Sequence, residues 1–190
     1  MASVVGICNS ALSKIGAKTI QSLTEGTQNA AICAGMYETA RDRALRSHPW
    51  AFAATRAQLA AAVDAPAFGP AHAYPLPADF VRLLRPDESD NVNTLRRTIE
   101  GGQILTDETA PLDIRYVRLV TDPNEMDALF REVVAVELAL DIVEPITQSN
   151  AKRNALVGLY DMMIREARKA NAFEAPPANP PDDTWLTARL

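Results

Sequence analysis

Histidine, cysteine and tryptophan are scarce in this chain of 190 residues, which has two of each. The histidines, His48 and His72, lie far apart, and no cysteine or carboxylate stands near them at the spacing of metal ligands. We therefore expect neither a metal nor another cofactor. Cys8 and Cys33 each lie in a helical apolar pattern, which predicts buried free thiols in a reducing cytosol rather than a disulfide or a catalytic Cys-His pair.

Long apolar runs and basic blocks are also missing. No stretch approaches the roughly 20 apolar residues of a membrane span, and the first residues lack the basic segment of a signal peptide. We therefore expect a protein that folds where it is made, with no membrane partner. No basic block is longer than Arg96-Arg97 and the net charge is -5, so tight binding to a phosphate backbone is not expected. A mildly acidic wall nevertheless lets DNA slide past without sticking.

What the chain does have is apolar periodicity at helical spacing. The pattern predicts four helices, over residues 3–16, 27–48, 124–145 and 147–170. Thr27 is a candidate N-cap of the second. The third is apolar on more than one side, which indicates a helix buried all round, and Pro145 is predicted to end it.

Between these helices the pattern is typical of short strands. Residues 50–59 fit a helix or a strand, with the strand favoured and Trp50 and Phe52 on one face. Gly101-Gly102 predicts a two-residue hairpin within residues 98–105, because such a turn needs positive φ angles. Residues 112–120 alternate apolar and polar side chains, and the strand they predict is expected to pair with the hairpin.

Together these patterns predict an α+β protein: a mainly α-helical bundle of about four helices, an inserted small antiparallel β domain and an extended C-terminal tail. The boundaries are residues 1–60 and 122–172 for the bundle, 61–121 for the β platform and 173–190 for the tail. The tail is rich in proline yet carries Trp185 and Leu186. A large aromatic side chain on an extended arm favours docking on a partner or on the parent domain.

Several segments, taken in order, resemble the tail tubular protein A family, the head-to-tail adaptors of short-tailed phages. They are residues 11–17 (ALSKIGA), 41–42 (RD), 45–53 (LRSHPWAFA), 74–83 (YPLPADFVRL), 99–101 (IEG), 104–106 (ILT), 114–117 (IRYV), 130 (F), 146–149 (ITQS) and 185–189 (WLTAR). The resemblance covers nearly the whole chain and contains no catalytic signature.

The resemblance implies a structural virion protein, not an enzyme, assembled in the host cytoplasm and located at the head-tail junction. It implies a dodecameric ring between the portal protein and a nozzle protein of the tail tubular protein B type, with DNA passing through a central channel. The tail would dock on the portal or on a neighbouring subunit. Its interface residues would be Phe173, Trp185, Leu186 and Arg189. The corner His48-Pro49-Trp50 is expected to end a helix and seat an aromatic ring between the helical and β parts.

Two other functions remain open from the sequence. One is a tail-associated factor that degrades peptidoglycan, with Glu100, Glu132 or Glu137 as general acid. The other is an accessory ring protein for DNA packaging, of the terminase small-subunit kind, which the acidic composition disfavours.

Overall fold

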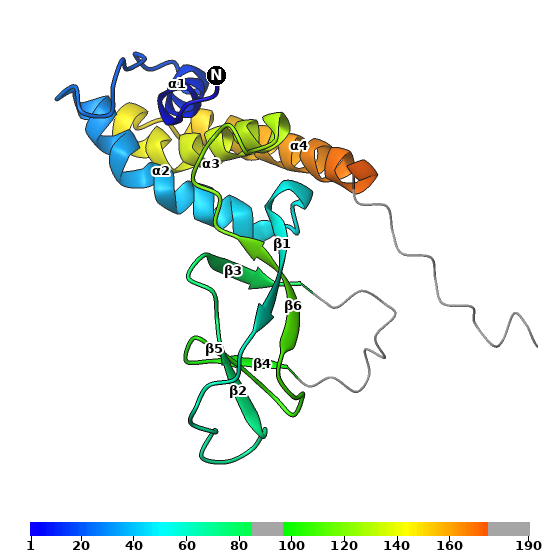
Figure 1. Cartoon of the computed structure of the whole chain (residues 1–190). Helices are drawn as coiled ribbons and strands as arrows, with labels where there is room; N and C mark the ends of the chain where they lie inside the picture. Colours follow the sequence, from blue (N-terminus) through cyan, green and yellow to red (C-terminus); the bar gives the residue numbers. More distant parts are fainter. Residues whose placement is uncertain (85–96, 175–190) are drawn as a thin grey trace, which may run out of the picture. The chain divides into compact units, whose positions relative to one another are not determined.

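The computed structural model describes residues 1–84 and 97–174. Within these residues the chain forms four α-helices and two three-stranded antiparallel sheets (Figure 1), so the predicted α+β class is confirmed. The described chain divides into a helical unit, residues 1–53 and 119–174, and a β unit within residues 54–118. The β unit is therefore an insertion between two parts of the helical unit.

The helical unit is built from four helices whose starts are capped by side chains. They are α1 (Val4–Lys14), α2 (Gln28–Ser47), α3 (Ala128–Thr147) and α4 (Asn150–Glu174). Thr27 accepts a hydrogen bond from the Ala30 N–H at 3.3 Å, which confirms the predicted N-cap of α2. Ser3 caps α1 and Asp127 caps α3 in the same manner.

Helix α3 is the centre of the helical unit, because α1, α2 and α4 all pack against it. Its fully buried residues lie on more than one side, as its broad apolar pattern predicted: Phe130, Val133, Val134, Ala135, Val136, Leu138, Ala139, Ile142 and Val143. The prediction that Pro145 ends this helix was wrong. Proline costs a helix one N–H bond, and Pro145 stands so close to the end that the helix continues to Thr147. It stops at Gln148, whose φ is 50°.

The β unit contains two separate sheets. Strands β1 (Ala54–Leu59), β6 (Leu112–Arg118) and β3 (Phe80–Leu83) form one, in the order β1-β6-β3. Strands β2 (His72–Pro75), β5 (Gln103–Thr106) and β4 (Thr98–Glu100) form the other, in the order β2-β5-β4. The β4-β5 hairpin turns at Gly101 (φ 55°) and Gly102 (φ 78°), which confirms the predicted hairpin.

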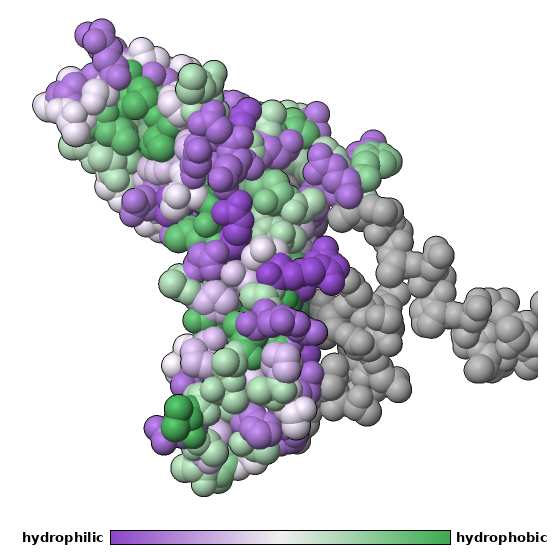
Figure 2. Space-filling view, in the orientation of Figure 1, coloured by the Kyte–Doolittle hydropathy of each residue, from purple (hydrophilic) through white to green (hydrophobic). Residues whose placement is uncertain are grey.

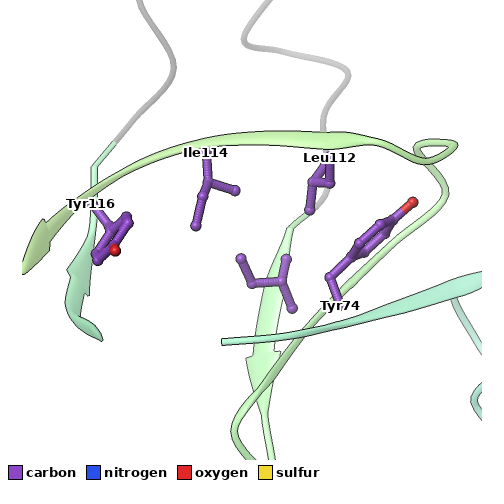
Figure 3. Packing of buried hydrophobic residues seen from close by; sticks show 5 residues of the cluster. Tyr74, Leu112, Ile114 and Tyr116 are labelled. Carbon is purple, nitrogen blue, oxygen red and sulfur yellow. The ribbon is translucent and has the colours of Figure 1, made fainter. Parts of the chain in front are cut away.

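The expectation that residues 112–120 pair with this hairpin was wrong. Strand β6 pairs with β1 and β3, and the hairpin pairs with β2. In Figure 3 the side chains of Leu112, Ile114 and Tyr116 all point from β6 to the side on which Tyr74 of the other sheet lies. These residues and Ile104 form one buried cluster. The hairpin and β6 therefore meet by packing of apolar faces rather than by backbone hydrogen bonds.

The structure also differs from the favoured prediction of one strand over residues 50–59. Residues Ala51–Ala53 form a single 3-10 turn, and β1 begins only at Ala54. Trp50 and Phe52 belong to the helical unit, where both rings contact Phe130 of α3 at centroid distances of 5.0 and 4.9 Å. Burial of two large rings on α3 outweighs the local alternation that favoured a strand.

Candidate interface at the end of the last helix

The predicted corner His48-Pro49-Trp50 ends α2 and carries a buried ring. Trp50 is 2% exposed, and its Nε1–H donates to the Ala44 carbonyl at 2.9 Å. The Ala44 carbonyl lies in the last turn of α2 and also accepts from the Ser47 hydroxyl at 2.8 Å, so both side chains bond the end of this helix. The His48 ring meets the Trp50 ring edge to face, with centroids 4.9 Å apart. The corner is thus a packed and hydrogen-bonded joint within the helical unit.

Asn171 in the last turn of α4 closes this joint, and sequence reasoning missed it. Its Oδ1 accepts from the Ala51 N–H at 2.6 Å, and its Nδ2–H donates to the Pro49 carbonyl at 3.3 Å. The same Nδ2 lies 3.1 Å from His48 Nε2. A signal was present: Asn171 continues, at helical spacing, the buried stripe of Leu156, Ile164 and Ala167. A polar residue in a buried stripe needs hydrogen-bond partners.

The predicted interface residue Phe173 follows two positions after Asn171 and is 79% exposed. Asn171 therefore holds the end of α4 at the corner while Phe173 projects a large apolar ring into solvent. The other predicted interface residues, Trp185, Leu186 and Arg189, lie outside the described residues. The geometry is that of an anchored helix end carrying an exposed aromatic residue.

Few other large apolar side chains are exposed in the described part of the chain. Besides Phe173 they are Met1, Met36, Val63, Phe68, Ile99, Val157 and Met162. On the face shown in Figure 2, polar and apolar residues are interspersed over both units. Scattered exposed apolar residues are normal for a protein surface, so each requires a further argument before it is given a role.

A polar network crosses the helical unit at Glu137, one of the three glutamates considered for a hydrolase. Glu137 is 6% exposed, and its carboxylate accepts from Arg43 of α2 and from Tyr160 of α4. Arg43 Nη2 also donates to Asp141 at 2.7 Å. Burial raises the pKa of Glu137 above its ordinary value, and the Arg43 guanidinium opposes that rise. Because the carboxylate is buried and bonded to two neighbours, it is poorly placed to meet a polymer substrate.

The other two glutamates lie in different settings. Glu132 of α3 accepts from Lys14 Nζ at 2.6 Å and from Ser10, so it ties α3 to α1. Glu100 lies on the exposed strand β4 of the β unit. Glu132 and Glu137, although on one helix, thus bind different bases and perform packing roles between different helix pairs.

The cysteines are free and buried, as predicted. A hydrogen bond to Cys33, together with burial, raises the pKa of the Cys8 thiol, which disfavours the reactive thiolate. No group of three His, Cys, Asp or Glu side chains within residues 1–84 and 97–174 is placed to hold a metal ion. No helix in those ranges has the length and apolarity needed to cross a bilayer.

No protein-family model matches the chain, and no curated protein sequence is significantly similar to it. Any function must therefore be argued from the residues themselves.

Proposed function

We propose that this protein is a structural adaptor of a short-tailed phage. Copies of the chain form a ring between the portal protein and the tail nozzle protein, and DNA passes through its centre without specific binding. The observation that carries the proposal is the anchored end of α4. Asn171 fixes this helix end to the corner at Pro49 and Ala51, and the exposed Phe173 follows at once.

An anchored helix end suits an adaptor because it limits the directions in which the following residues leave the domain. A preorganised start lowers the entropy lost when a terminal segment docks on a partner. A large aromatic ring at the start of that segment is the kind of residue that contributes most to protein interfaces. In a ring the same contact is repeated in every copy, so each one contributes to avidity.

The fold is compatible with the resemblance in the sequence. Both describe a helical bundle interrupted by a small antiparallel β insertion, here between Ala53 and Leu119. Most of the groups considered for other chemistry are used internally, because the thiols are buried and Glu132 and Glu137 join helices, whereas Glu100 is exposed.

Sedimentation velocity of the chain mixed with the portal ring encoded nearby in its genome tests the proposal. We expect co-sedimentation at about one copy per portal subunit. Deletion of residues 174–190, and separately Phe173→Ala, should weaken it, whereas Val63→Ala, which removes a similarly exposed apolar side chain from the β unit, should not. An intact chain that never co-sediments with the portal at micromolar concentration rejects the adaptor function.

A further inference from the structure

Helix α4 has an outward face on which no other part of its own unit packs. This α4 outer face consists of Gly158, Met162, Arg165 and Lys169, all exposed. Met162 is 55% exposed, and a Cβ built on Gly158 meets nothing within 4 Å. The side of α4 that packs on the bundle carries Leu156, Ile164 and Ala167 instead. The outer face therefore combines an exposed methionine beside a glycine with two basic residues one turn apart.

Helix α2 has a comparable face of opposite charge. This α2 outer face consists of Ala31, Gly35, Glu38 and Asp42, all exposed. A Cβ built on Gly35 meets nothing within 4 Å, so the backbone there is uncovered. Asp42 keeps half of its side chain exposed while it accepts from the adjacent Arg41. The face thus pairs small residues with two acidic residues one turn apart.

The two faces match in spacing as well as in charge. On each helix the four residues follow one another by four, three and four positions, the spacing of the seam along which helices pack side by side. Aligning them in parallel sets Glu38 against Arg165 and Asp42 against Lys169. In the same register Met162 lies against Gly35, where no side chain occupies the space.

The helix directions permit this parallel register between two copies. Both α2 and α4 run antiparallel to the central α3, so they point the same way within one helical unit (Figure 1). In a ring of many copies each subunit is turned by only a small angle from the next. The α4 helix of one copy and the α2 helix of its neighbour then remain close to parallel, at the shallow crossing angles that favour helix packing.

We propose that the α4 outer face of one copy docks on the α2 outer face of the next. The partner of each face is a second copy of this chain. Charge complementarity between the faces and the fit of Met162 to Gly35 favour this partner. Because the two faces are different surfaces of one chain, the contact is head-to-tail and propagates until a ring closes. This inference rests on the proposed function for the ring. Asp161 and Glu166 flank the α4 outer face, and Arg46 flanks the α2 outer face.

Charge reversal tests the contact in the full-length chain. One variant combines Glu38→Lys with Asp42→Lys, and a second combines Arg165→Glu with Lys169→Glu. Each alone should raise the concentration needed for self-association, measured by sedimentation velocity, about tenfold or more, because like charges then oppose each other. Mixed together, the two variants should associate again as alternating copies. One contact in such a mixture joins the native pair of faces, and the other joins a charge-swapped pair whose charges are again opposite. A chain with all four changes should associate again.

Two further variants serve as a charge control and as a test of the packing. Asp161→Lys with Glu166→Lys changes the net charge as much as the first variant but lies beside the face, and it should leave association intact. Gly35→Leu places a side chain in open space of the monomer, so it should fold normally and yet lose association because Met162 no longer fits.

The proposal is overturned if the charge-reversed chains each assemble like the parent, or if their mixture does not associate. A thiol pair made by Gly35→Cys and Met162→Cys in one chain provides a second readout on the assembled form. We expect oxidation to give a ladder of linked copies, alone or on the portal ring, and no ladder in either setting rejects this interface. If the charge-reversed chains still form a ring and bind the portal, this inference is refuted and the proposed function is not. If the unmodified chain does not bind the portal, the proposed function is refuted.

Discussion

Asn171 and Ala51, which are 120 positions apart in the sequence, are joined by a 2.6 Å hydrogen bond from the Ala51 N–H to the Asn171 side-chain oxygen. Asn171 is only 8% exposed, and it also donates to the Pro49 carbonyl. One amide side chain therefore satisfies a backbone donor and a backbone acceptor of the corner between α2 and β1. This bond holds the last turn of α4, which carries Phe173, at the corner.

Replacing this amide should destabilise the helical unit. Asn171→Ala leaves the Ala51 N–H and the Pro49 carbonyl without the partner described here, at a cost of about 1–3 kcal/mol in the free energy of unfolding. Urea unfolding followed by circular dichroism measures the change. Asn154→Ala, the same substitution at an exposed position of α4, should stay within about 0.5 kcal/mol of the parent. Equal effects of the two substitutions would show that the hydrogen bonds of Asn171 do not stabilise the corner.

Replacing Tyr37 should have the opposite effect on the free energy of unfolding. Its ring is 4% exposed, and its hydroxyl is buried with no hydrogen-bond partner among the described residues. Burial raises its pKa to about 12. Because an unpaired buried hydroxyl costs about 1–3 kcal/mol, Tyr37→Phe should leave the free energy of unfolding unchanged or increase it by up to that amount. A loss of more than about 1 kcal/mol in urea unfolding would show that the hydroxyl makes a stabilising bond.

The raised pKa of Glu137 should make the free energy of unfolding depend on pH. The folded chain holds this proton over a pH range in which the unfolded chain, with a pKa near 4.5, has lost it. The resulting stabilisation is complete below the unfolded pKa and is lost as the pH rises through the folded pKa. Subtracting the free energy of unfolding of Glu137→Gln from that of the parent should therefore give a difference that falls as the pH rises above the unfolded pKa. Glu144→Gln, on the exposed side of α3, is the control, and a difference that rises over this range contradicts the prediction.

Glu108 in the β unit should show the reverse dependence. Arg97 donates to both carboxylate oxygens, at 2.6 and 2.7 Å, and this pairing lowers the pKa of Glu108. The stabilisation is present above the unfolded pKa and is lost as the pH falls through the folded pKa. Glu108→Gln should cost about 1–3 kcal/mol near neutral pH and progressively less in acid. Urea unfolding of both chains at a series of pH values from neutral to acid measures this cost. A cost of Glu108→Gln that does not change with pH argues against the ion pair.

What the sequence by itself determined is local. The four helices follow from apolar spacing and caps such as Thr27, and the hairpin follows from Gly101-Gly102, because these signals depend only on residues a few positions apart. The exposed Phe173 was also among the residues predicted for an interface from the sequence, whereas Trp185, Leu186 and Arg189 stay predictions outside the described residues.

The tertiary structure decided the long-range partners. Alternation along residues 112–118 says that one face is buried, but not which strands lie on either side, so the pairing of β6 with β1 and β3 could not be predicted. Trp50 and Phe52 joined the helical unit because Phe130, far along the chain, offers them a buried surface. Asn171 acquired its role only where two distant backbone segments needed a donor and an acceptor. Each of these outcomes depends on contacts between residues far apart in sequence, and their free energies are not contained in any local pattern.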